Sequence, residues 1–118
     1  MPNPSPGFVK NPAKVLTIVP QMGTVIVTAG GKVIAQSSDA KLLSEPPYPD
    51  RIYVPFKDIR FDELSKTTHS THCPYKGDAS YWTVPGDTGT NAMWAYQTPY
   101  DEVTEIKDHA SSIRTGPG

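Results

Sequence analysis

Residues 67–82 hold the densest group of side chains that could do chemistry. The stretch reads Thr-Thr-His-Ser-Thr-His-Cys-Pro-Tyr-Lys-Gly-Asp-Ala-Ser-Tyr-Trp and contains the only cysteine of the chain, Cys73. A nucleophilic cysteine needs a lowered thiol pKa, which a nearby base or cation supplies. Neighbouring side chains on a strand point to opposite faces, so we do not expect His72 to contact Cys73. The alternative, a buried thiol that packs as a small apolar side chain, is the one we favour.

The spacing of His69, His72 and Cys73 also raises the question of a zinc site. Structural zinc takes four ligands, usually as two short pairs that are well separated in sequence. The chain has no Cys-x-x-Cys, and its third histidine, His109, lies near the C-terminal end. We therefore expect no metal and no other cofactor. A single cysteine also predicts no disulfide within the chain.

Lys76, between Tyr75 and Gly77, is the candidate for binding an anion. A glycine lets the backbone approach a ligand closely, and a lysine supplies a positive charge. The alternative is a surface lysine on a tight turn, or one that is paired with Glu45 or Asp58. Glu45 precedes two prolines, and apolar neighbours could raise its pKa so that it acts as a general acid or base. A salt bridge that holds the proline-rich loop to the sheet is the other interpretation of Glu45.

The expected site is a binding site at the turn around Tyr75 and Lys76. If the strand stays extended, His72, Pro74 and Lys76 fall on one face, which places a base beside a cation. Aromatic side chains of the strands are expected to pack in the core or to line the pocket. The predicted binding residues are Glu45, Tyr53, His72, Tyr75, Lys76 and Trp94. No catalytic residue is identified, so the sequence leaves open whether the protein is an enzyme.

The elements that position these side chains are expected to be short strands. Thirteen prolines and nine glycines in 118 residues argue against long helices, and this length suits one domain with a modest core. Residues 37–43 fit either a helical turn or a bent strand, residues 56–65 a turn followed by a short strand or helical piece, and residues 99–106 one helical turn. The expected strands are residues 14–19, 24–28, 32–35, 51–54, 67–73, 79–84 and 92–97, with a hairpin turn at Gly30 and Gly31.

These elements predict a single, mainly β domain at residues 14–110, with largely antiparallel strands. A flexible, proline-rich arm at residues 1–13 precedes it, and a polar tail at residues 111–118 follows it.

Charge and hydropathy exclude several classes of function. The formal net charge is −1 and no basic block is present, so we expect no nucleic-acid partner. The apolar run at residues 15–19 is too short to cross a bilayer, and residues 1–13 do not form a secretory signal. We therefore expect a cytoplasmic protein that does not bind membranes.

Residues 71–82, Thr-His-Cys-Pro-Tyr-Lys-Gly-Asp-Ala-Ser-Tyr-Trp, strongly resemble the signature of the domain-of-unknown-function family numbered 427. That family is also catalogued under the heading "nucleotidyltransferase domain". Similar segments extend over roughly residues 23–110, for example Gly-Lys-Val-Ile-Ala at 31–35 and Ala-Met-Trp-Ala-Tyr at 92–96. The resemblance implies a compact, mainly β, tent-like fold and no established reaction. Family members tend to have a final strand with Phe-Tyr, whereas this chain has Ala-Ser-Ser-Ile at 110–113, which implies a weak last strand or a C-terminus that contributes to an interface.

Three functions are weighed. The first is binding or catalysis of a small polar or anionic molecule near the Cys-Pro-Tyr-Lys-Gly turn. The second is a non-enzymatic protein-interaction domain, in which edge strands and the proline-rich segments 1–12 and 45–49 make the contacts, with a homodimer as one possibility. The third, nucleotidyl transfer, needs metal-binding carboxylates beside a Gly-Ser phosphate loop. We identify neither, and we do not expect this activity.

Overall fold

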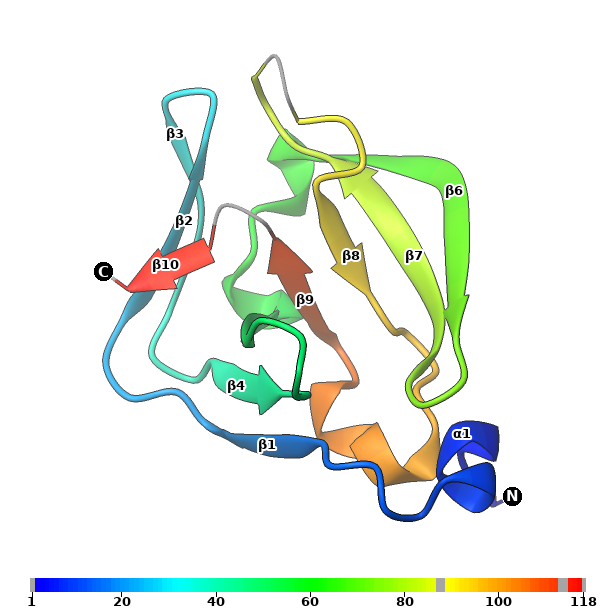
Figure 1. The fold of residues 1–118 in the computed structure, drawn as a ribbon. Helices are drawn as coiled ribbons and strands as arrows, with labels where there is room; N and C mark the ends of the chain where they lie inside the picture. The colour runs from blue at the N-terminus through cyan, green and yellow to red at the C-terminus, as the bar shows by residue number, and fades with distance from the viewer. Residues whose placement is uncertain (1, 87–88, 113–114, 118) are drawn as a thin grey trace.

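The described chain folds into two antiparallel sheets (Figure 1). A computed structural model describes residues 2–86, 89–112 and 115–117. Within these residues, the larger sheet has seven strands in the order β1-β4-β5-β9-β8-β7-β6, and the smaller has three in the order β10-β2-β3. The prediction of a mainly β fold with short, antiparallel strands and little helix is confirmed.

The elements are short throughout. The helical segments are α1 (Pro6–Lys10) and the 3-10 turns η1 (Phe56–Asp58), η2 (Phe61–Glu63) and η3 (Asp101–Ile106). In the described part of the chain, no helix has the length and apolar character needed to cross a membrane. The strands are β1 (Thr17–Pro20), β2 (Val25–Ala29), β3 (Lys32–Ser37), β4 (Lys41–Ser44), β5 (Arg51–Pro55), β6 (Ser65–Cys73), β7 (Gly77–Thr83), β8 (Met93–Ala95), β9 (His109–Ser112) and β10 (Thr115–Pro117).

The expected glycine hairpin forms between β2 and β3. Gly30 and Gly31 both have positive φ, 57° and 78°, which is the conformation that a tight hairpin turn requires and that glycine adopts without strain. Two ambiguous segments also take definite forms. Residues 41–44 form the strand β4, and residues 56–63 form the two 3-10 turns η1 and η2.

Both ends of the chain differ from the expected local structure. Residues 1–13 were expected to be a flexible arm, but α1 forms there, with Ser5 as its N-cap and the Gly7 amide donating to the Pro74 carbonyl at 2.8 Å. Residues 111–118 were expected to be a polar tail, but Ser111 and Ser112 belong to β9, at the centre of the large sheet. The neighbouring strands stabilise this polar segment as a strand, and its local sequence alone does not indicate that packing. The division into arm, domain and tail stays a prediction.

Side chains on the large sheet divide between two faces, as strand geometry requires. One face packs against the β2–β3 hairpin, which stands beside the large sheet in Figure 1. Val54 and Met93 point to that side and pack with Val25 and Ile34. The opposite face carries a second apolar cluster, which contains Leu43, Tyr53, Ala79, Tyr96, Val103 and Ile106. The hairpin leaves this second face uncovered, and the candidate site lies there.

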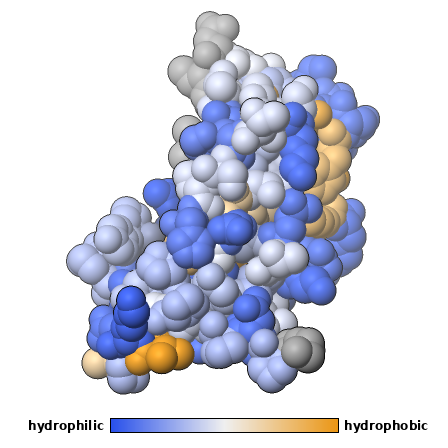
Figure 2. Space-filling view, turned by 90° about the vertical axis from the view of Figure 1, so that its right-hand side faces the viewer, coloured by the Kyte–Doolittle hydropathy of each residue, from blue (hydrophilic) through white to orange (hydrophobic). Residues whose placement is uncertain are grey.

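The edge strand β6 is polar and exposed along most of its length. Figure 2 shows the face of the molecule that carries it as largely hydrophilic. Charged and polar side chains on an edge strand discourage pairing with another chain. The β6 edge is therefore poorly suited to strand addition.

Candidate functional site

A cavity of about 750 Å³ opens on the second face of the large sheet. Its walls come from the β5, β6, β7 and β8 strands, from the loop after β4 and from Lys14, ahead of β1. Six of the lining residues are aromatic: Tyr48, Tyr53, Tyr75, Tyr81, Trp94 and Tyr96. A volume of this size suits a small organic molecule.

Strand register explains why these aromatic side chains converge. Tyr53 on β5 is paired with Ser111 on β9, Ser111 with Trp94 on β8, and Trp94 with Tyr81 on β7. Residues that are directly opposite each other on neighbouring strands share a face of the sheet. The same alternation places Arg51 beside Tyr53 on β5, two residues away.

Glu45 lies between two lysines at one end of the cavity. Its carboxylate is 2.9 Å from the Lys76 Nζ and 3.3 Å from the Lys14 Nζ. All three side chains are largely buried, with 10% of Glu45, 13% of Lys76 and 14% of Lys14 exposed. Glu45 and Lys76 therefore form the ion pair that was one of the interpretations of each residue, and Lys14 is a third member of this charged cluster.

The turn after β6 holds Lys76 in place. Gly77 has a φ of 121°, a conformation that favours glycine, and a Cβ there would lie 3.3 Å from the Thr98 carbonyl oxygen. The Tyr100 amide donates to the Lys76 carbonyl at 3.1 Å, which ties the turn to the start of η3. Lys76 Nζ then lies 5.4 Å from the centroid of the Tyr96 ring, within reach of a cation–π contact.

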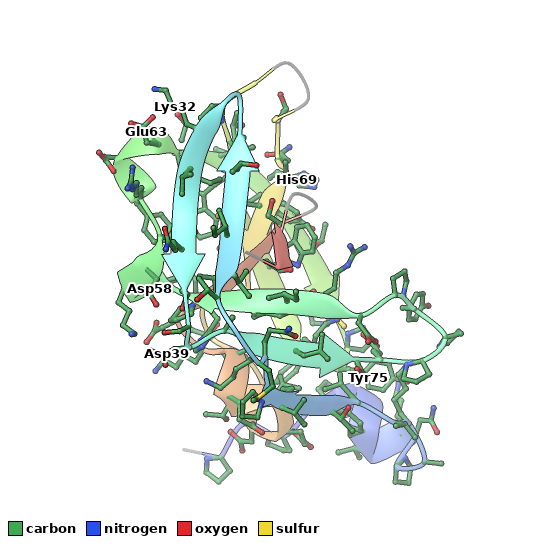
Figure 3. The ribbon with its side chains drawn as sticks, turned by 90° about the vertical axis from the view of Figure 1, so that its left-hand side faces the viewer. Lys32, Asp39, Asp58, Glu63, His69 and Tyr75 are labelled. Carbon is green, nitrogen blue, oxygen red and sulfur yellow. The ribbon has the colours of Figure 1, made fainter. Side chains whose placement is uncertain are left out.

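The N-terminal segment completes the wall beside Tyr75. Phe8 of α1 packs edge-to-face on the Tyr75 ring, with 5.1 Å between ring centroids. Lys14 Nζ lies 5.0 Å from the Tyr75 ring centroid and 5.4 Å from that of Tyr48. Figure 3 shows Tyr75 beside the N-terminal helix. The segment that was expected to be a free arm thus contributes to the site.

Arg51 is a cation of a different kind from the two lysines. Its guanidinium carbon lies 5.5 Å from the centroid of the Trp94 ring, and no ion pair is formed by Arg51 within the described residues. The Trp94 indole Nε1–H itself donates to the Tyr53 hydroxyl at 3.3 Å. Arg51 can therefore offer its planar set of donors to a ligand.

Two tyrosines of the cavity, Tyr53 and Tyr96, are uncharged at neutral pH. Burial raises the pKa of Tyr53 to about 12, although the Trp94 hydrogen bond opposes this shift. Burial also raises the pKa of Tyr96 well above its ordinary value. Both hydroxyls keep their protons and remain available as hydrogen-bond donors.

The structure brings five of the six predicted binding residues to the cavity and leaves one outside. Glu45, Tyr53, Tyr75, Lys76 and Trp94 line it. The exception, His72, is exposed, and its Nδ1 forms a 2.7 Å hydrogen bond with the Asp78 carboxylate. The expected face shared by His72, Pro74 and Lys76 does not form, because β6 ends at Cys73 and strand alternation stops at the turn. A binding role for His72 stays a prediction, and this geometry gives it no support.

Cys73 lies on the cavity side of β6 and is partly buried against the second apolar cluster. The Cys73 and His72 side chains point to opposite faces of β6, as expected for neighbouring residues on a strand. His69 packs on Tyr81, with 4.5 Å between ring centroids, and Figure 3 shows it far from Tyr75. Among the residues that the structure describes, no group of three or more His, Cys, Asp or Glu side chains could hold a metal ion.

Sequence reasoning missed two cations of the cavity, Lys14 and Arg51. Arg51 carried a usable signal, since it stands two residues before Tyr53 on a predicted strand and so shares its face. Lys14 carried none, because it lies in a loop whose path depends on the packing of α1 and β1. Tyr81 and Tyr96 were expected only in general terms, as aromatic residues of the core or of the pocket lining, and Tyr48 was not singled out.

Comparison with known families gives one match over most of the chain. A family model described as "Domain of unknown function (DUF427)" matches residues 17–115. This range includes every strand of the large sheet and every residue of the cavity except Lys14. A search of curated proteins found no match.

Proposed function

The chain belongs to the DUF427 family of domains of unknown function, and we propose that it binds a small, planar organic anion in the cavity beside Trp94. The observation that carries this proposal is Arg51, a guanidinium stacked near the Trp94 ring without a carboxylate partner in the described chain. Such a group matches a carboxylate or a phosphate in two parallel hydrogen bonds.

The charge of the cavity supports an anionic ligand. Arg51, Lys14 and Lys76 bring three positive charges, and Glu45 brings one negative charge, which leaves a formal excess of two positive charges. The whole chain has a formal charge of −1, so the positive excess is local. Low-dielectric walls strengthen the attraction of such a site for an anion.

The aromatic walls support a flat ligand. Trp94 and Tyr81 lie side by side on neighbouring strands, at the paired positions of β8 and β7. Aromatic rings stack in offset or edge-to-face arrangements that contribute about 0.5–1.5 kcal/mol beyond their burial. An aromatic acid can therefore place its charge on Arg51 and its ring against Trp94.

Glu45 contributes to the site through the lysines. Each lysine has three N–H donors and directs one toward the Glu45 carboxylate, so the others remain for a ligand. The carboxylate keeps both ammonium groups at the cavity wall. No catalytic step is assigned to it.

Tryptophan fluorescence tests the proposal directly, with probes that differ in charge. Benzoate and phenyl phosphate should quench the emission and bind, whereas benzyl alcohol and benzylamine should bind at least tenfold more weakly. Trp94→Phe should abolish the quenching, and Trp82→Phe should keep it, because Trp82 packs on the opposite face with Phe56 and Phe61. Equal binding of the neutral, cationic and anionic probes would overturn the proposal.

A protein-interaction role has one observation in its favour. β1 is an edge strand of the large sheet. The apolar side chain of Val19 on this strand is 48% exposed, and those of Val15 and Met22 before and after it are 58% and 85% exposed. An exposed edge with apolar side chains is a common docking surface. Light scattering across a range of protein concentrations tests it: a dimer that Val19→Lys dissociates would support this role, and a monomer at all concentrations would exclude self-association.

A further inference from the structure

The positive charge at one end of the cavity is only half balanced by the protein. Lys14 and Lys76 share a single carboxylate, that of Glu45, at 3.3 and 2.9 Å. Among the residues that the structure describes, no second carboxylate forms an ion pair with either lysine. We call these three side chains the lysine cluster. It is largely buried and carries one positive charge in excess, and a buried charge without a partner is unfavourable.

Arg51 is a second, separate centre of positive charge. It forms no ion pair within the described residues, and its guanidinium carbon lies 5.5 Å from the centroid of the Trp94 ring. Arg51 and the lysine cluster together account for the whole formal excess of two positive charges among the residues that line the cavity. A ligand with one negative charge can balance only one of these two centres.

The two centres lie close enough for one small molecule to contact both. Arg51 lies over Trp94, and the Lys76 Nζ lies 5.4 Å from the centroid of the Tyr96 ring. Trp94 and Tyr96 are two positions apart in the chain, so their Cα atoms are separated by about 7 Å at most. All four side chains line the same cavity of about 750 Å³. A ligand in this cavity can therefore reach both centres.

We infer that the ligand is a dianion, an aromatic molecule with two acidic groups, of which one binds Arg51 and the other binds the lysine cluster. The inference rests on the proposed function and narrows its ligand from organic anions in general to those with two separate negative groups. Each lysine directs one of its three N–H donors toward Glu45 and keeps the others for the second acidic group. Glu45 thereby sets at two the number of negative charges that the cavity balances.

Titration calorimetry with benzoate and the three benzenedicarboxylates tests the inference on the full chain. Phthalate, isophthalate and terephthalate carry the same two charges at three different spacings. At least one of them should bind the wild type tenfold more tightly than benzoate, the gain expected from a further charge-assisted hydrogen bond. The gains should differ at least threefold among the three isomers, because the two centres have fixed positions. The monomethyl ester of the best isomer has only one charge, so its affinity should lie within threefold of that of benzoate.

Removal of one lysine should abolish the advantage of the second charge. In Lys76→Met, Glu45 pairs with Lys14 alone and the cluster becomes neutral, so the gain of the best isomer should fall below threefold. The affinity for benzoate should change by less than threefold, since Arg51 is still present. Lys14→Met replaces Lys76→Met should that variant fold poorly, and the same loss of the gain is expected.

Lys66→Met is the matched control. Lys66 also lies over a tryptophan, with its Nζ 5.9 Å from the centroid of the Trp82 ring, but it is exposed and does not line the cavity. The tenfold gain of the best dicarboxylate should persist in this variant. Loss of the gain in Lys66→Met would show that the net charge of the chain, and not the lysine cluster, causes the preference, and would overturn the inference.

The remaining outcomes separate this inference from the proposed function. If benzoate binds and no dicarboxylate binds more tightly, or if the gain survives in Lys76→Met, the dianion is refuted and the anion site stands. Equal gains for all three isomers would indicate a general attraction for negative charge and would also refute the dianion alone. If neither benzoate nor any dicarboxylate binds the wild type, both the anion site and the dianion are refuted.

Discussion

Replacement of Glu45 by glutamine is the sharpest perturbation of the site's electrostatics. Glu45→Gln keeps the shape of the side chain but removes the charge that holds Lys14 and Lys76, at 3.3 and 2.9 Å. Two lysines, 14% and 13% exposed, then remain close together without a counter-charge. We expect a loss of folding stability together with unchanged or tighter binding of anions.

The magnitude follows from the burial of the cluster. Removal of one partner from a fully buried ion pair costs about 3–5 kcal/mol. The side chains here keep some solvent contact and glutamine still accepts a hydrogen bond, so we expect about 2–3 kcal/mol, which lowers Tm by about 8–12 °C in a chain of this size. Lys76→Met leaves Glu45 paired with Lys14 and should cost about 1–2 kcal/mol.

Urea denaturation followed by tryptophan fluorescence measures these changes. The double variant Glu45→Gln/Lys76→Met should lose at least about 1 kcal/mol less than the sum of the single variants, because contacting residues are coupled. Glu63→Gln is the matched control: its pair with Lys32 is 33% and 60% exposed, and its loss should stay within about 0.5 kcal/mol. Strict additivity, together with a Glu45→Gln loss no larger than that of Glu63→Gln, would refute the reasoning.

Two further predictions concern residues outside the cavity lining. Burial and the nearby charge of Lys41 lower the pKa of His109 below its ordinary value of 6.5, although the Lys107 carbonyl and Asp108 oppose this shift. The unfolded chain therefore binds the proton more readily than the folded chain does. Folding stability should consequently fall as pH drops from about 7 to 5. His109→Gln should flatten the dependence of Tm on pH in that range, and an unchanged slope would count against it. Gly7→Ala should loosen α1 and lower the free energy of unfolding by about 1–3 kcal/mol, because a Cβ at this position would lie 2.7 Å from the Tyr75 ring and 2.8 Å from the Pro74 carbonyl oxygen. The control is Val9→Ala on the same helix: Val9 is 70% exposed, and its replacement should change the free energy of unfolding by less than about 0.5 kcal/mol. Equal losses in the two variants would contradict the close packing of Gly7.

The sequence predicted those parts of the fold that have local causes. The Gly30-Gly31 turn and the β-branched residues on both sides of it are sufficient for a hairpin. The central strand β9 has no such local signal, because His-Ala-Ser-Ser is neither β-branched nor alternating. It is a strand because β5 and β8 pair with it from both sides, and that is tertiary information.

The same distinction applies to the candidate site. Lys76 and Glu45 were predicted from the turn chemistry of Gly77 and the prolines, which are local features. His72 was included because alternation was extended through residues 74–76, where the chain turns and the period of two no longer holds. Lys14 reaches the site through the docking of the N-terminal segment, which no short motif encodes.

The most direct test of the anion site is the affinity of benzoate for the Arg51→Met variant, measured by titration calorimetry. Arg60→Met serves as the control, because Arg60 is an exposed arginine outside the cavity. Loss of a charge-assisted hydrogen bond of about 1.5–3 kcal/mol predicts at least tenfold weaker binding for Arg51→Met and unchanged binding for Arg60→Met. Equal affinity of the wild type and Arg51→Met would contradict the account.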